Sequence, residues 1–193
     1  MNPKALFNLT YGMFLLTTRE EGKDYGCIIN TAIQVARDPD RIAISVQNNN
    51  KTCEVLKRTE LFNLSALTTD APFDLFRQFG MQSARDVEKF KGYPGIDRAP
   101  NTLPILSSYA NMYLSCYVTQ TIDLGSHTLF IADVTEAKVL SNVPSATYAY
   151  YFANIKPQPA KPAAEKKGFV CKICGYVYEG EALPEDFICP LCK

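Results

Sequence analysis

The sequence has no excess of either charge, no long apolar run and only one histidine. Twenty basic residues balance twenty acidic ones, so the charge does not indicate nucleic acid or an anionic membrane as a partner. No apolar run approaches the roughly 20 residues that span a bilayer. The apolar patch at residues 13–16 is also too short for the core of a signal peptide. We therefore expect a cytoplasmic protein.

Several catalytic motifs are missing as well. Gly-x-Gly-x-x-Gly does not occur, and the nearest approach is an irregular Gly-Tyr-Pro-Gly stretch at residues 92–95. A Rossmann dinucleotide fold is therefore not expected. The chain has no catalytic serine motif, and His127 alone cannot form the paired-histidine motif of a zinc protease.

Runs rich in Val, Ile, Thr and Tyr, bounded by Gly, Pro, Asp or Asn, predict strands along most of the chain. The expected strands are residues 11–18, 26–35, 41–46, 61–67, 112–122 and 128–140. The expected short helices are residues 51–58 capped by Asn50, 72–79 capped by Asp70, and 84–90 capped by Ser83. Successive strands with short helices between them favour a mainly β, antiparallel barrel over a doubly wound sheet.

A change in composition marks a boundary near residue 156. Residues 156–168 read KPQPAKPAAEKKG, with three prolines and no large apolar side chain. Such a stretch favours extended, polyproline-like geometry, and at about 3.1 Å per residue it would reach on the order of 40 Å. It predicts a semi-rigid tether between a domain at residues 1–155 and a small one at residues 169–193.

The cysteines are concentrated in this small C-terminal segment. It holds two Cys-x-x-Cys pairs, Cys171 with Cys174 and Cys189 with Cys192. In a reducing compartment this spacing favours a four-thiolate metal site over disulfides. So small a segment cannot fold on an apolar core alone, and we expect metal binding to stabilise it. The remaining, widely spaced thiols are Cys27, Cys53 and Cys116.

The spacing alone leaves the metal open, because four thiolates suit either zinc or iron. The surrounding residues, CKICGYVYEG followed by CPLC, resemble rubredoxin in the compact form appended to rubrerythrins. The shared features are Gly175, Tyr176, Tyr178, Phe187 and Pro190. The resemblance implies one iron ion, held by all four cysteines and used for electron transfer, with a structural zinc ribbon as the alternative.

One turn of the larger domain has the groups that bind phosphate. Residues 48–52, Asn-Asn-Asn-Lys-Thr, follow an expected strand and open an expected helix. Their amides, hydroxyl and cation suit a phosphate at a helix N-terminus. An asparagine-rich turn that merely caps a helix looks the same, so both interpretations stay open at this point.

The stretches YGMFLLTTREEGKDYGCIINTAIQVARDPDRIAISVQNNNKT, FNLSALTTDAPFDLFRQFGMQSARDVEKF and GSHTLFIADV resemble, in this order, the FMN-binding split-barrel flavin reductases. The likeness extends from about residue 7 to about residue 155. It implies a six-stranded antiparallel split barrel, a homodimer, and FMN bound near the dimer interface.

The same resemblance assigns side chains to the cofactor. The expected contacts of the flavin ring or ribityl chain are Asn30 and Thr31. The expected contacts of the ribityl and phosphate groups are Asn48, Asn50, Lys51 and Thr52. The residues expected to border the FMN or NADH pocket are Ser83, Arg85 and Lys89. A solvated helix face would explain Arg85 and Lys89 almost as well.

His127 is the candidate catalytic residue. It lies in the Gly-x-His-Thr motif that the resemblance puts beside the nicotinamide, although a hydrogen-bonded histidine at a strand start explains it equally well. Cys27 stands three residues before Asn30, and a free thiol on a buried strand is usually a small apolar filler.

The order of the two modules resembles the high-molecular-weight rubredoxins. That resemblance implies NAD(P)H oxidation at FMN, electron transfer to iron, and delivery to a flavodiiron protein that reduces nitric oxide or dioxygen. Two alternatives stay open. The barrel could be a non-catalytic FMN carrier. Alternatively, the protein could be a plain flavin reductase in which the C-terminal segment is a zinc ribbon that only docks other proteins.

Overall fold

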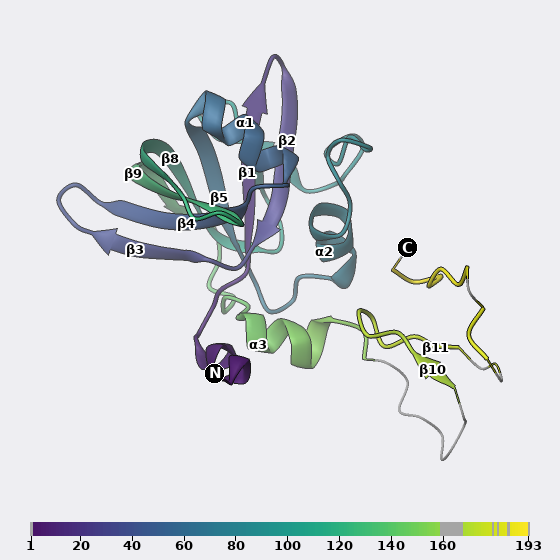
Figure 1. Ribbon diagram of the computed structural model, residues 1–193. Helices are drawn as coiled ribbons and strands as arrows, with labels where there is room; N and C mark the ends of the chain where they lie inside the picture. Colours follow the sequence, from purple (N-terminus) through teal and green to yellow (C-terminus); the bar gives the residue numbers. More distant parts are fainter. Residues whose placement is uncertain (1, 159–167, 179, 181, 185, 193) are drawn as a thin grey trace. The chain divides into compact units, whose positions relative to one another are not determined.

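The computed structural model describes residues 2–158, 168–178, 180, 182–184 and 186–192. The chain divides into two compact units, Met1–Ile155 and Lys156–Lys193 (Figure 1). Residues 159–167 of the expected tether lie outside the described residues. None of the described helices has the length and apolar character needed to cross a membrane.

The larger unit contains one main sheet, one small sheet and several short helices. Its strands are β1 Phe14–Glu20, β2 Lys23–Ile29, β3 Ala32–Ala36, β4 Arg41–Gln47, β5 Leu61–Leu67, β6 Ile96–Arg98, β7 Pro104–Leu106, β8 Ala110–Asp123 and β9 His127–Val139. Its helices are η1 Pro3–Asn8, α1 Lys51–Thr59, α2 Phe73–Gly80, α3 Tyr148–Tyr150 and η2 Tyr151–Ile155.

The main sheet is antiparallel, seven-stranded and ordered β2-β1-β5-β8-β9-β4-β3. Its two edge strands, β2 and β3, follow each other in the chain, and only Asn30 and Thr31 join them. A flat sheet would hold these edges about 29 Å apart, whereas the connection covers at most about 11 Å. The sheet must therefore curl until its two edges lie close together at this connection, which makes it an open barrel.

The mainly β, antiparallel class expected from the sequence is confirmed, and the strand at Leu61–Leu67 has the predicted bounds. The predicted strand at residues 26–35 is two strands, because the chain leaves one edge of the sheet and joins the other at Asn30 and Thr31. This break explains why the sheet has seven strands where six were expected.

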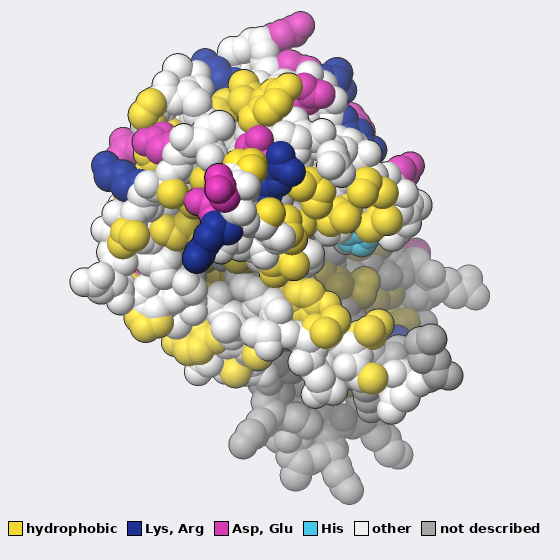
Figure 2. All heavy atoms as spheres, turned by 90° about the vertical axis from the view of Figure 1, so that its left-hand side faces the viewer, with side chains coloured by type: hydrophobic (Ala, Val, Ile, Leu, Met, Phe, Trp, Pro, Cys, Tyr) yellow, Lys and Arg dark blue, Asp and Glu magenta, His cyan; other side chains and the backbone are white. Residues whose placement is uncertain are grey.

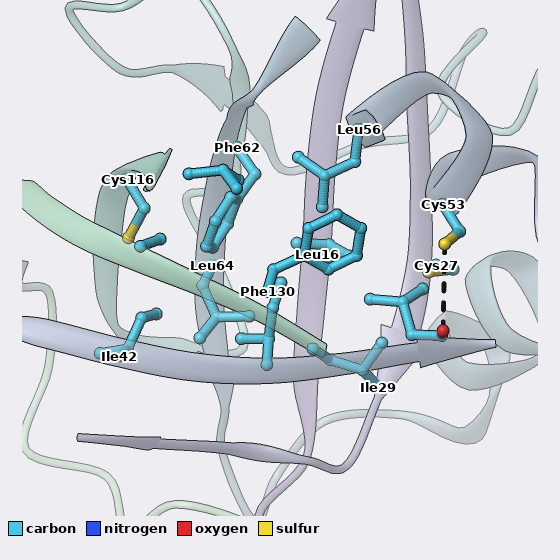
Figure 3. Packing of buried hydrophobic residues seen from close by; sticks show 14 residues of the cluster. Leu16, Cys27, Ile29, Ile42, Cys53, Leu56, Phe62, Leu64, Cys116 and Phe130 are labelled. Atoms are coloured by element: carbon cyan, nitrogen blue, oxygen red, sulfur yellow. Dashed lines mark hydrogen bonds between the residues drawn. The ribbon is translucent and has the colours of Figure 1, made fainter. Parts of the chain in front are cut away.

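Both faces of β1 are buried, and each packs on a different core. Leu16 points into the barrel, where it meets Phe62, Phe130 and, from α1, Leu56 (Figure 3). Leu15, its neighbour in the chain, belongs to the second cluster, which α2 covers. Successive side chains of a strand point to opposite faces, so β1 joins the interior of the barrel to the helical layer outside it.

The expected cap of α1 is confirmed. The Asn50 side chain accepts a hydrogen bond from the Thr52 backbone N–H at 2.9 Å, and the helix runs to Thr59. The expected cap of α2 is wrong, because Asp70 instead accepts a hydrogen bond from the Thr68 hydroxyl, and Pro72 stands at the helix start.

The predicted helix at residues 84–90 is also wrong. The chain makes one turn, in which the N–H groups of Asp86 and Val87 both bond to the Ser83 carbonyl. It then packs Phe90 on Phe79, with ring centroids 5.0 Å apart. These tertiary contacts override the local capping signal.

The smaller unit is a hairpin and a loop around four cysteines. Strands β10 Phe169–Val170 and β11 Val177–Tyr178 pair antiparallel. Gly175 adopts a φ of 80°, which glycine tolerates well, and its N–H bonds to the Cys171 carbonyl at 2.9 Å. Phe187 packs on Tyr178 with ring centroids 4.8 Å apart.

We expect Phe130→Ala to lower the free energy of unfolding by about 3–5 kcal/mol, because it removes a fully buried ring from the barrel core. Val139→Ala, on the same strand but 74% exposed, should change it by less than about 0.5 kcal/mol. Urea unfolding followed by far-UV circular dichroism measures both. Equal midpoints for the two variants would contradict the core assignment.

Candidate functional site

A cavity of about 280 Å³ opens beside the junction of β2 and β3. Its apolar wall includes Met13, Ile28, Ile29 and Phe79. Its polar groups include Asn30, Gln47, Asn50, Gln82, Lys89 and His127. The polar groups make up most of the exposed lining, and convergent polar groups orient the ligand in small-molecule sites.

Four of the predicted site residues meet at this cavity: Asn30, Asn50, Lys89 and His127. They come from the β2–β3 connection, the cap of α1, the loop after α2 and the start of β9. Gln47 was missed by sequence reasoning. It pairs with His127 across β4 and β9, a register that no local pattern predicts.

Lys89 is buried, with 4% of its surface exposed. Its ammonium donates hydrogen bonds to the carbonyls of Phe79 at 2.9 Å and Gly26 at 3.1 Å. Burial lowers its pKa below the ordinary lysine value. Among the described residues no carboxylate forms an ion pair with it. The interpretation of Lys89 as part of a solvated helix face is therefore wrong.

Gly26 allows the loop after α2, which carries Lys89, to approach β2. A Cβ atom at this position would lie 2.7 Å from the Phe90 ring and 3.0 Å from the Leu16 carbonyl oxygen. A side chain would thus displace the segment that carries Lys89. The glycine is required here by close packing.

The other predicted cofactor contacts do not line the cavity: Thr31, Asn48, Lys51, Thr52, Ser83 and Arg85. Lys51 and Arg85 both form ion pairs with Glu54. The Ser83 hydroxyl accepts a hydrogen bond from the Arg85 backbone N–H at 3.1 Å. The Thr52 hydroxyl is buried, and it has no hydrogen-bond partner of normal geometry among the residues that the structure describes.

The Asn48 side chain contacts the turn between β8 and β9 and does not line the cavity. Its side-chain amide donates hydrogen bonds to the Asp123 carboxylate at 3.1 Å and to the Gly125 carbonyl at 2.7 Å. Its side-chain oxygen accepts one from the Thr128 hydroxyl. The two asparagines of the turn at residues 48–50 therefore serve different sites: Asn48 contacts the β8–β9 turn, and Asn50 lines the cavity.

Cys27 lines the cavity as a neutral thiol. Burial raises its pKa to about 11, although Lys89 and the Thr52 hydroxyl act in the opposite direction. Burial likewise raises the pKa of Cys116 to about 12. Both thiols stay protonated near neutral pH, as expected of small apolar fillers.

His127 is partly buried at the start of β9. Its Nδ1 forms a hydrogen bond of 2.9 Å with the Ser126 hydroxyl. Within the described part of the chain, Nε2 has no hydrogen-bond partner. One ring nitrogen is therefore held by a hydrogen bond, and the imidazole lines the cavity.

In the smaller unit the four predicted metal ligands, Cys171, Cys174, Cys189 and Cys192, come together. Their sulfur atoms all lie within 4.8 Å of one another. The Cys171–Cys192 and Cys174–Cys189 sulfurs are 3.6 and 3.5 Å apart, too far for disulfides. Four thiolates about 2.3 Å from one tetrahedral ion would be about 3.8 Å apart, so the cluster fits one metal ion.

Backbone amides point at this cluster. N–H groups of Cys174 and Ile173 lower the pKa of Cys171 to about 6. Such hydrogen bonds stabilise a thiolate, and in iron–sulfur sites they also tune the reduction potential. The neighbouring thiols act in the opposite direction on Cys174 and Cys192, whose pKa values are raised.

Comparison with protein families separates the same two parts. The profile of the flavin reductase like domain matches residues 6–158. The chain belongs to the flavin reductase family. The rubrerythrin, rubredoxin-like domain matches residues 169–193. The protein is thus a flavin reductase-like oxidoreductase fused to a rubredoxin-like metal domain, as the sequence resemblance indicated.

Individual relatives agree with this assignment. The high molecular weight rubredoxin of Moorella thermoacetica is 34% identical over 100% of this chain and 96% of its own length. A ferric-chelate reductase (NAD(P)H) of Archaeoglobus fulgidus is 28% identical over 78% of this chain and 89% of its own. The resemblance to high-molecular-weight rubredoxins is therefore confirmed.

A solved structure shares the fold. The crystal structure of an FMN-binding protein from Thermus thermophilus superimposes with a TM-score of 0.66 at 18% identity, over 98% of this chain and 96% of that one. At this identity the likeness concerns the fold alone.

We expect Cys174→Ser or Cys189→Ser to release the metal and unfold residues 169–193, while flavin stays bound to the barrel, because the small unit depends on its metal. Metal analysis and flavin fluorescence of the purified variants measure this. Cys116→Ala, which removes a buried thiol of the barrel, should retain the metal. Loss of flavin from both serine variants would show that the two units are not independent.

Proposed function

We propose that the protein oxidises NAD(P)H at a bound FMN and passes the electrons to a rubredoxin-type iron and then to an acceptor such as a flavodiiron protein. The observation that carries this proposal is the presence of a flavin reductase domain and a four-thiolate site in one chain. FMN accepts a two-electron hydride and releases electrons singly, whereas one iron with four thiolates accepts one.

The residues of the cavity fit a flavin. Its volume, about 280 Å³, is just below the range of about 300–1,000 Å³ for ligand pockets. Ile28, Ile29 and Phe79 offer an apolar wall to a planar ring. Asn30 and Asn50 offer amides, and Lys89 offers a buried cation to an electron-rich or anionic group.

His127 is the proposed contact of the nicotinamide. Its Nδ1 forms a hydrogen bond with the Ser126 hydroxyl, and the partly buried imidazole lines the cavity. A positioned imidazole can orient a substrate amide and exclude water from the reacting atoms.

The edge strand β3 supports the proposed homodimer. Ile33 and Val35 on this strand are exposed, and among the described strands β4 alone pairs with β3. Hydrophobic side chains form several patches on the face that carries the hairpin of β3 and β4 (Figure 2). An exposed apolar edge strand is a common site of association.

The small unit has a surface suited to a protein acceptor. Ile173, Ile188 and Leu191 are 79%, 70% and 71% exposed. Each directly precedes one of the cysteines of the cluster. These exposed apolar side chains lie next to the cysteines. A partner protein could pack on them and approach the metal closely without having to bury charged side chains.

A plain flavin reductase with a structural zinc ribbon is the second candidate, because the sulfur spacing suits zinc as well as iron. The visible spectrum of the isolated protein, with metal analysis, distinguishes the two. Ferric thiolate bands support the electron-transfer proposal, and zinc in their place would refute it. Bleaching of flavin bands by NADH would exclude the non-catalytic carrier.

We expect Lys89→Met to weaken FMN binding by at least about tenfold, since a charge-assisted hydrogen bond contributes about 1.5–3 kcal/mol. Fluorescence titration of the flavin-free protein measures the affinity. Lys91→Met is the matched control, because the Lys91 side chain, two residues away, is 82% exposed. If both variants bind FMN like the unmodified protein, Lys89 does not serve the cofactor.

Cleaving the chain near Ala163 should slow iron reduction by NADH and make it depend on the concentration of the freed tail. A tether keeps two partners at an effective concentration of order millimolar, about a thousandfold above a micromolar solution. Stopped-flow spectroscopy of intact and cleaved protein measures both rates. Equal rates at micromolar protein would mean that this flavin does not feed the iron.

A further inference from the structure

Asn48 uses its whole hydrogen-bonding capacity within the protein. The amide nitrogen donates to Asp123 and Gly125, as described above. The oxygen accepts from the Thr128 hydroxyl and, at 3.4 Å, from the Lys57 ammonium of α1. An asparagine amide offers two donors and about two acceptor sites. Asn48 therefore has little capacity left for a phosphate group.

The backbone of Asn48 adds a further contact to the same turn. Its N–H bonds to the Ser126 carbonyl at 3.0 Å and extends the pairing of β4 with β9 by one residue. Within the turn, the Leu124 N–H bonds to the His127 carbonyl at 2.8 Å. The contacts of Asn48 thus lie on both sides of His127 in the chain, at Ser126 and at Thr128.

We infer that Asn48 is a positioning residue for His127: it fastens the β8–β9 turn to the end of β4 and to α1, and so determines where the imidazole stands in the cavity. The inference rests on the proposed role of His127 beside the nicotinamide. It assigns Asn48 a function different from the phosphate contact that the sequence suggested.

The expected effect of losing Asn48 follows from geometry. Asn48→Ala leaves the Asp123 carboxylate, the Gly125 carbonyl and the Thr128 hydroxyl without this shared partner, so the turn should relax. A displacement of about 1 Å in a substrate-positioning group can lower a rate up to a hundredfold. We expect kcat/KM for NAD(P)H to fall about tenfold, mainly through KM, while the dissociation constant of FMN changes less than about twofold.

The single histidine of the chain provides a direct readout. Proton–carbon NMR spectra of the isolated protein contain one set of imidazole signals, which need no assignment against other histidines. Asn48→Ala should shift these signals and broaden them. This measurement does not require NAD(P)H oxidation.

Exchanging the side chains of Asn48 and Asp123 tests the hydrogen bond between them. Asn48→Asp puts a carboxylate opposite Asp123, and the two like charges should displace the turn. Adding Asp123→Asn restores the donor–acceptor pair between these two side chains with the roles reversed, while the Gly125 carbonyl still lacks the donor that Asn48 supplied. The double variant should therefore recover part of the original histidine signals and of kcat/KM relative to Asn48→Asp, whereas purely additive effects would overturn the inference.

Asn111→Ala is the matched control. Asn111 also bridges two segments of this domain, with its amide donating to the Val143 carbonyl at 2.9 Å and to the Ser145 hydroxyl at 2.7 Å, and neither segment belongs to the β8–β9 turn. It should lower stability without shifting the histidine signals. Equal shifts in Asn48→Ala and Asn111→Ala, or none in Asn48→Ala, would overturn the inference. An unmodified protein that fails to oxidise NAD(P)H would refute only the proposed function, because the NMR result decides the inference independently.

Discussion

The connection between β2 and β3 is the constraint on which the rest of the barrel depends. Asn30 and Thr31 carry the chain from one edge of the main sheet to the other, and so short a connection forces the edges together. Closure encloses the core around Phe62 and Phe130. It also places Asn30 at the mouth of the cavity, so the element that closes the barrel contributes to the candidate site.

The cavity combines neutral and charged groups in a way that favours an electron-rich ligand. Cys27 is kept neutral by burial, and Lys89 is buried among carbonyl groups. A buried ammonium without a carboxylate partner is costly in an apolar interior. A ligand that brings negative charge would offset that cost, which gives Lys89 a physical reason to line this cavity.

The two units are stabilised by different means. The barrel buries a large apolar core on both faces of β1. The smaller unit has a few aromatic contacts, such as Phe187 on Tyr178, and several exposed aliphatic side chains. Such a segment cannot bury enough surface to fold by itself. Its four clustered thiols fit one metal ion, whose binding would supply the stability that the apolar core lacks.

The sequence by itself determined the features that depend on near neighbours. Cys171 and Cys174 are held by one short turn, Asn50 caps the helix that follows it directly, and Leu61–Leu67 is a strand of the expected length. Tertiary structure alone decided the rest. Lys89 is buried, and carbonyls distant in the chain accept hydrogen bonds from its ammonium. Asn48 donates a hydrogen bond to a turn some 75 residues away. Local patterns describe contacts within a few residues, whereas the pairing of β4 with β9 and the closure of the sheet bring together groups whose spacing in the chain carries no signal.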